Sequence, residues 1–143
     1  MQAVVMVHHK GMKDTKGTKE SGLKWSTVVI GAAIEVHRHL GPGLSEQVYE
    51  SALSRELWLR DVTFERQVSL PIEYKGAKLG CGARIDLLVE RSLVVELKAV
   101  DHIAAVHRAQ LLTYLRLTRL PVGLLINFNV EVVKNGVRRV LNG

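Results

Sequence analysis

The chain has little cysteine, and this scarcity removes several classes of protein. Cys81 is the only cysteine among the 143 residues. An intramolecular disulfide framework is therefore excluded, and so is a zinc ribbon or an iron–sulfur cluster held by four thiolates. A metal bound to this protein would be held by oxygen or imidazole ligands.

The sequence also lacks long apolar runs. No stretch reaches the ~18 uninterrupted apolar residues of a membrane span, and the most apolar helical candidate, residues 28–36, is short and contains Glu35. The N-terminus shows no apolar segment with a small-residue cleavage site, so no export signal is evident. We therefore expect a soluble, cytoplasmic protein with no membrane partner.

Composition and charge are those of a globular domain with a modest preference for polyanions. Hydrophobic residues make up 47% and charged residues 24% of a chain long enough for one domain. The net charge is +6, and half of it lies in the first 24 residues. The remainder is mildly basic, which suits a nucleic-acid surface but is a weak indicator by itself.

The N-terminal segment differs in composition from the rest. Residues 10–22 are rich in Lys, Gly, Thr and Ser and hold almost no apolar side chain, so they bury too little surface to offset their ordering entropy. We predict a flexible basic arm over residues 1–23 and a folded domain over residues 24–143. The apolar residues 3–7 fit a short strand, although we favour a tail.

Apolar residues at spacings of three and four predict three helices. The first runs from about Lys24 to Leu40, the second follows Ser45 as its cap, and the third runs from Asp101 as its cap to about Thr118. Alternation and turn residues predict strands over residues 64–70, 84–89, 93–98, 122–126 and 138–141, an edge hairpin over 71–79, and interruptions at Gly80 and Gly82. This order predicts an α/β fold with a mixed β-sheet flanked by helices.

The hairpin formed by residues 84–98 separates its side chains into two faces. Its aliphatic face comprises Ile85, Leu87, Val89, Leu93, Val95 and Leu97. The other face includes Arg84, Asp86, Glu96 and Lys98. A loop centred on Arg91 keeps each set together, and it sets Asp86 opposite Glu96 and Arg84 opposite Lys98.

This register predicts a site for a divalent metal. Two carboxylates about 5 Å apart repel each other unless a cation lies between them, and Mg²⁺ takes such oxygen ligands together with water and phosphate. Lys98 shares the face of Glu96 and could hold the attacking water or the phosphate. The alternative is that these are solvated charges on an amphipathic hairpin, but the aliphatic strands in mid-chain favour a buried site.

Asp86 followed by Glu96-Leu97-Lys98 resembles the PD-(D/E)XK nuclease superfamily, with Ile85 in place of the proline. Residues 43–49, Gly-Leu-Ser-Glu-Gln-Val-Tyr, fit the pattern that names the GxxExxY family of that superfamily. The resemblance extends from about residue 29 to 140. It implies a restriction-endonuclease-like core with the order αβββαβ.

The resemblance also implies a set of metal ligands. They are Asp86, Glu96, the backbone carbonyl of Leu97, and Glu46 on the second helix. Spacing alone fits Glu46 equally well as a first-turn acid favoured by the helix dipole, and the resemblance assigns it to the site.

Residues 110–114 match the QxxxY motif of the RecB-type branch. Gln110 then joins Asp86, Glu96 and Lys98 as a catalytic residue. The residues that we expect to contact nucleic acid are Tyr49, Arg84 and Tyr114. Trp25 and Trp58 are core candidates first and base-stacking platforms second.

The function that these residues predict is a nuclease that depends on Mg²⁺ or Mn²⁺ and hydrolyses DNA phosphodiester bonds with a metal-activated water. One alternative is a non-catalytic nucleic-acid-binding or assembly module on a nuclease fold, and another is a structural protein with solvated charges. By analogy with small nucleases we expect a homodimer.

Overall fold

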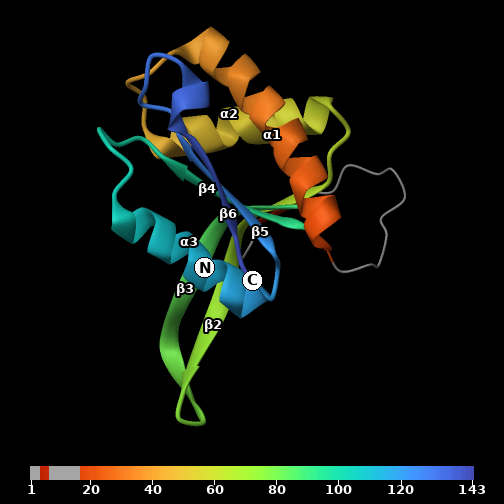
Figure 1. Ribbon diagram of the computed structural model, residues 1–143, viewed down its shortest axis with the longest axis vertical. Coiled ribbons are helices and arrows are strands. Elements are labelled where there is room, and N and C mark those ends of the chain that lie inside the picture. Colours follow the sequence, from red (N-terminus) through yellow and green to blue (C-terminus); the bar gives the residue numbers. More distant parts are fainter. Residues whose placement is uncertain (1–3, 7–16) are drawn as a thin grey trace.

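The computed structural model describes residues 4–6 and 17–143, which form a six-stranded mixed sheet between helices (Figure 1). The elements are β1 (Val4–Met6), α1 (Lys19–Leu40), α2 (Glu46–Leu59), β2 (Phe64–Tyr74), β3 (Ala77–Val89), β4 (Leu93–Lys98), α3 (Ala105–Thr118), β5 (Val122–Asn127), the 3₁₀ helix η1 (Val133–Gly136) and β6 (Val137–Leu141). The α/β class and the restriction-endonuclease-like core are as predicted.

The strands lie in chain order across the sheet, from β1 to β6. β4 and β5 are parallel, and every other neighbouring pair is antiparallel. The parallel pair needs a crossover connection, and α3 supplies it. No helix within the described part of the chain is long and apolar enough to cross a membrane.

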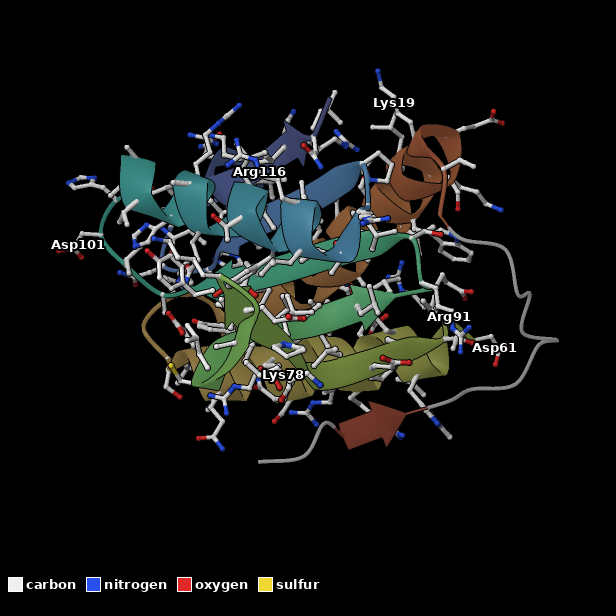
Figure 2. The ribbon with its side chains drawn as sticks, turned by 90° about the horizontal axis from the view of Figure 1, so that it is seen from below. Lys19, Asp61, Lys78, Arg91, Asp101 and Arg116 are labelled. Atoms are coloured by element: carbon white, nitrogen blue, oxygen red, sulfur yellow. The ribbon has the colours of Figure 1, made fainter. Side chains whose placement is uncertain are left out.

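Two apolar cores lie on opposite faces of the sheet. Helices α1 and α2 cover one face, where Val29, Leu53 and Leu57 pack against strand residues such as Leu87 and Val95. Helix α3 covers the other face, with Leu111 and Leu115 against strand residues that include Ile85 and Val94. Figure 2 shows α2 and α3 on opposite sides of the sheet. Charged side chains of the central strands are therefore placed between layers rather than in open solvent.

The first helix begins earlier than the sequence suggested. It starts at Lys19, because the Thr18 hydroxyl caps it by accepting the N–H of Ser21 at 3.1 Å. The Ser21 hydroxyl lies 2.8 Å from that of Ser92, and Gly22 is buried. Residues 19–23, which we had assigned to the flexible arm, thus belong to the folded domain. Residues 4–6 form β1 against β2 rather than the tail that we favoured, and residues 7–16 lie outside the described part.

The third helix begins later than predicted, at Ala105 rather than at Asp101. The Asn127 side chain holds the chain after β4 by bonding both the N–H and the carbonyl of Val100, at 3.0 and 2.8 Å. That pair of bonds keeps the segment out of the helix. The cap is then Ala104, whose N–H is accepted by Nδ1 of His107.

Gly80 and Gly82 do not interrupt the strand pair, because β3 runs unbroken from Ala77 to Val89. A side-chain carbon at Gly82 would lie 2.3 Å from the carbonyl oxygen of Leu70. The glycine therefore allows β2 to approach closely beside Pro71, where the pairing also shifts register. The predicted turn at Lys75-Gly76 is present and has both residues in the left-handed region.

Tyr49 organises the loop that joins α1 to α2. Its ring is fully buried and stacks on Phe128, with centroids 4.5 Å apart. Its hydroxyl donates to the carbonyl of Gly41 and accepts the N–H of Leu44 at 3.2 Å. Our expectation that Tyr49 contacts nucleic acid is therefore corrected, because no part of the ring is accessible.

The substitution Tyr49→Phe should lower the free energy of unfolding by about 1–2 kcal/mol, because two backbone groups of the loop lose the hydroxyl that they share. Urea unfolding followed by circular dichroism measures the change. Tyr74→Phe is the matched control, since Tyr74 is 61% exposed at the β2–β3 turn, and it should leave the midpoint unchanged. Equal effects of the two substitutions would contradict the role assigned to the Tyr49 hydroxyl.

Candidate active site

The register of the β3–β4 hairpin agrees with the sequence prediction. Leu87 pairs with Val95, Leu88 with Val94 and Val89 with Leu93, which is the pairing expected for a loop centred on Arg91. The same register places Asp86 opposite Glu96 one step further on. The described ladder ends before that step, so the predicted pairing of Arg84 with Lys98 is not formed.

Two carboxylates replace the backbone ladder where it ends. The N–H of Asp86 donates to Oε1 of Glu96 at 2.9 Å. The N–H of Leu97 donates to Oδ2 of Asp86 at 2.8 Å. Each strand thus carries a carboxylate that is fixed by an amide of the other strand, and the two acids are held side by side.

Burial, together with neighbouring negative charges, raises the pKa of both carboxyl groups. Burial is the larger cause of the pKa of Glu96 rising to about 8, and the neighbouring charge of Asp86 adds to it. Burial also raises the pKa of Asp86, with further contributions from the negative charges of Glu50 and Glu46 and an opposing one from the Leu97 N–H. At neutral pH the pair therefore retains a proton when no cation is bound.

Lys98 and the two polar residues of α3 meet on the same side of the sheet. Nζ of Lys98 donates to Oε1 of Gln110 at 3.0 Å. Tyr114, buried and one turn later on α3, is linked to Gln110 by a hydrogen bond. Burial, with the charge of Glu96 next, raises the pKa of the Tyr114 hydroxyl. The structure thus brings together five predicted residues from three elements: Asp86 of β3, Glu96 and Lys98 of β4, and Gln110 and Tyr114 of α3.

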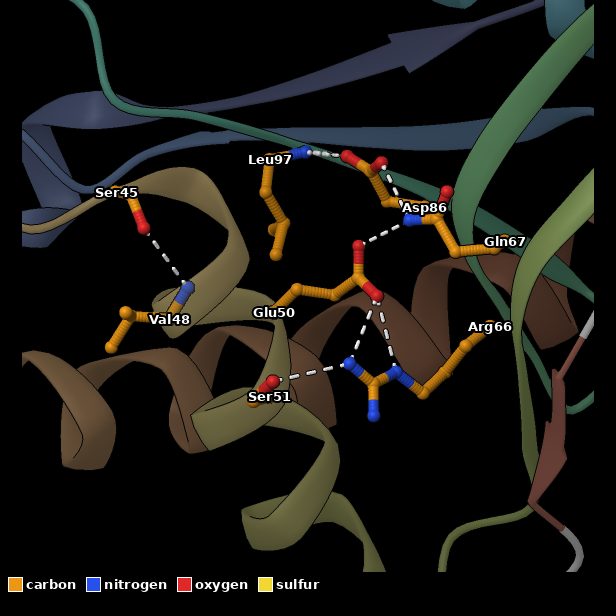
Figure 3. A network of polar contacts seen from close by, with 8 residues as sticks. All are labelled: Ser45, Val48, Glu50, Ser51, Arg66, Gln67, Asp86 and Leu97. Carbon is orange, nitrogen blue, oxygen red and sulfur yellow. Dashed lines mark hydrogen bonds and ion pairs between the residues drawn. The ribbon is translucent and has the colours of Figure 1, made fainter.

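The structure adds three residues that the sequence did not indicate: Glu50, Arg66 and Gln67 (Figure 3). Glu50 is 7% exposed and forms an ion pair with Arg66 at 3.1 Å. The Gln67 amide donates to Oε1 of Glu50 and, at 3.4 Å, to Oδ1 of Asp86. Gln67 therefore connects α2 to Asp86 on β3.

Gln67 takes an unusual backbone conformation to make these bonds. Its φ angle is +52°, the left-handed region, although it lies within β2. Arg66 pairs with Leu87 and Val68 with Ile85, and the position between them has no pairing in the described ladder. The residue that would complete this ladder on β3 is Asp86, so Asp86 lies at a gap on both sides. Strained backbone of this kind is concentrated at functional sites.

Only one of these three residues carried a signal in the sequence. Glu50 follows Glu46 by one helical turn, so it shares that face of α2. Gln67 carried none, because its position opposite Asp86 depends on the register shift between Pro71 and Glu73. Counting back from the Lys75-Gly76 turn without this shift would have set Gln67 opposite Arg84.

A cleft of about 470 Å³ opens beside Asp86, between α2 and the β2–β3 pair. Its lining residues are Glu46, Gln47, Glu50, Arg66, Gln67, Arg84 and Asp86. Glu46 and Arg84 are exposed there, one acidic and one basic. The cleft is large enough for a nucleotide-sized group.

The residues of the site fit a divalent cation only in part. Among the described residues, no group of three His, Cys, Asp or Glu side chains is placed to hold a metal, so Glu46 is not gathered with Asp86 and Glu96. The buried Glu96 and the half-buried Asp86, however, form a hard oxygen donor set, and burial is the largest cause of the raised pKa of each carboxyl group. A divalent cation would offset the cost of that burial.

The hairpin carboxylates, the adjacent lysine and the flanking helices define the site of a nuclease-like α/β fold. The model of the PD-(D/E)XK nuclease superfamily matches residues 23–140, and the chain belongs to this superfamily. No curated protein and no solved structure matches it. Membership implies nucleic acid as the kind of partner and a divalent metal as the usual cofactor.

The left-handed conformation of Gln67 can be tested by comparing two substitutions. Gln67→Ala and Gln67→Gly both remove the amide, but only glycine adopts a positive φ without steric cost. Gln67→Gly should therefore be the more stable variant, by roughly 0.5–1 kcal/mol in urea unfolding. Ser69, two residues further along the same strand, is the control position. There the alanine variant should be more stable than the glycine variant. If glycine were the more stable replacement at both positions, or alanine at both, the strained backbone at Gln67 would be contradicted.

The raised pKa of Glu96 predicts that stability falls as pH rises. Between the unfolded pKa near 4.5 and the folded pKa of about 8, the native state binds the extra proton, so unfolding is favoured by each increase in pH, by at most about 1.4 kcal/mol per unit. Glu96→Gln should flatten this dependence in urea unfolding with chelator at pH 5 and pH 8. Glu73→Gln, on the exposed hairpin, should retain the parent slope.

Proposed function

We propose that the protein is a Mg²⁺- or Mn²⁺-dependent nuclease that hydrolyses phosphodiester bonds of DNA. The observation that supports it is the juxtaposition of Asp86 and Glu96 on adjacent strands, with Lys98 beside them. Superfamily membership over residues 23–140 agrees with this chemistry. A bound divalent ion would supply Lewis-acid activation of water and charge neutralisation at the phosphate.

The residues of the chain then divide the remaining work. Asp86 and Glu96 would hold the cation, and the backbone amides that fix their carboxylates keep both oriented before it binds. Lys98 would orient the attacking water or stabilise charge that develops on the phosphate. Gln110 holds the lysine ammonium in place.

The network on α2 would place the substrate strand. Glu50 is engaged by Arg66 and Gln67, so it acts on Asp86 through Gln67 and through its charge. Arg84, at the cleft, would contact the DNA backbone. Tyr114 has little exposed surface, and we assign it to supporting Gln110, with contact to nucleic acid only through its hydroxyl.

We further propose that the chain belongs to the GxxExxY family within its superfamily. The three fixed residues of that motif are Gly43, Glu46 and Tyr49. Gly43 has a φ of +100° in the loop before α2, and Tyr49 holds that loop through its hydroxyl. Glu46 lies at the cleft, where a moderate shift of its side chain would bring it toward a cation.

Purified protein should cut DNA in the presence of Mg²⁺, and Lys98→Ala or Glu96→Gln should reduce the rate by at least about 100-fold, because each removes an interaction needed in the transition state. Lys19→Ala is the matched lysine control. Lys19 is exposed at the start of α1 (Figure 2), and its loss should change the rate by less than about twofold.

Calorimetry with Mn²⁺ separates this function from the alternative of a non-catalytic module. Parent protein that binds Mn²⁺ through Asp86 and Glu96 but cuts no nucleic acid would favour that module. Cleavage that survives Lys98→Ala and Glu96→Gln unchanged would show that the activity belongs to a contaminant, and the proposal would fail.

A further inference from the structure

A second cleft lies beyond the active site along α2. It has a volume of about 370 Å³ and is lined by Ser51, Ser54, Arg55, Trp58 and Arg66; we refer to it as the Trp58 cleft. This volume lies in the range of small-ligand sites. None of the roles assigned above uses its serines, Arg55 or Trp58.

Ser54 brings an unsatisfied polar group to the lining of the Trp58 cleft. Its side chain is 4% exposed, and its hydroxyl is the one buried side-chain polar atom without a hydrogen-bond partner among the described residues. Buried hydroxyls normally have a partner, because an unsatisfied one loses its bond to water without compensation. A polar group entering the cleft would supply that partner.

The remaining lining residues favour a ligand that is both planar and anionic. Trp58 is 39% exposed, and the Arg55 guanidinium lies 5.0 Å from the centre of its ring. Nucleobases stack on aromatic rings and on guanidinium planes alike. Arg55 and Arg66 bring two positive charges, of which that of Arg66 is shared with Glu50. A base with its phosphate matches both features.

The position of the Trp58 cleft fits a strand that also passes through the active site. Residues 46–50 of α2 line the first cleft and residues 51–58 line the second, so the two follow each other along one helix. At 1.5 Å per residue their centres are about 10 Å apart, which corresponds to about three nucleotides at the rise of one DNA strand. Arg66 borders both clefts.

We propose that the Trp58 cleft binds an unpaired nucleotide of the substrate, with its base on the Trp58–Arg55 surface and its phosphate toward Arg66 and the serine hydroxyls. The proposal rests on the nuclease function and narrows it. A base inside a duplex has both faces covered by its neighbours, so the cleft selects single strands or frayed ends close to the bond that is cut.

Tryptophan fluorescence tests this site directly. The chain has two tryptophans, so Trp25→Phe leaves Trp58 as the reporter. A short single-stranded oligothymidylate, added in chelator to prevent cleavage, should quench Trp58 emission to saturation. The fully paired duplex of the same length and inorganic phosphate alone should quench it much less, because neither offers an accessible base.

Substitutions then locate the binding. Fluorescence anisotropy of a labelled strand measures the affinity for oligothymidylate. Trp58→Ala should weaken this affinity by about tenfold or more, whereas Trp58→Phe should retain most of it. Arg55→Gln, at an exposed position that tolerates change, should weaken affinity and lower the slope against log salt by about 0.7. Leu59→Ala is the control, since Leu59 is 56% exposed on the same helix but does not line the cleft.

Three results would overturn the proposal: unchanged Trp58 emission, equal losses of affinity for Trp58→Ala and Leu59→Ala, or full quenching by phosphate alone. A fourth is Trp58 emission that depends on protein concentration without DNA, because it would mean that a second copy of the chain covers the cleft.

Failure of this subsite is distinguishable from failure of the nuclease function. Cleavage that needs Glu96 but not Trp58 removes only the subsite, whereas Trp58-dependent binding without cleavage removes only the catalysis.

Discussion

The structure depends on keeping two carboxylates side by side between packed layers. Asp86 and Glu96 lie on neighbouring strands, and Glu96 is only 4% exposed. Charges in such a place are costly unless they are paired. A backbone amide bound to each carboxylate and the nearby charge of Lys98 offset part of this energetic cost. The uncompensated part is expressed as the raised pKa of the two acids. The sheet provides the rigid frame that prevents the two acids from separating.

The same constraint explains the irregular backbone around Asp86. Regular pairing on both sides would use the amides that the carboxylates need. At Asp86 the ladder with β2 is therefore interrupted, and the ladder with β4 ends. On the β4 side the opening is filled by the Glu96 side chain, and on the β2 side by Gln67 in its left-handed conformation. Glu50 and Arg66 then connect this gap to α2, so the helix and the sheet cannot shift independently at the site.

Much of this arrangement could be predicted from the sequence, because strand parity is a strong constraint. The odd aliphatic positions determined the register of the hairpin, and the register placed Asp86 beside Glu96. Leu87, Val89, Leu93, Val95 and Leu97 share one core as predicted. Ile85, predicted on the same face, lies instead in the opposite core with Val94 and α3, beyond the gap in the ladder at Asp86. The ends of α2 followed from Ser45 and from the fading of apolar spacing near Arg60.

The features that could not be predicted depend on tertiary contacts. The start of α3 is set by Asn127, which is 27 positions away from Val100 in the chain. The start of α1 depends on Thr18, in a segment whose composition alone suggests disorder. The position of Gln67 follows from an irregularity beside Pro71 that no local pattern specifies. Trp58 lies at helical core spacing, yet it is 39% exposed.

The β2–β3 hairpin extends well past the rest of the molecule (Figure 1). Within the described residues, β1 pairs with β2 only as far as Arg66, and β4 pairs with β3 only as far as Leu87. The outer part is thus a two-stranded ribbon with both edges open, and such ribbons are marginally stable alone. Pro71, Lys75 and Lys78 discourage further strands from adding to these edges. The ribbon is therefore a separate unit of local unfolding, able to open and reclose while the buried carboxylates stay in place.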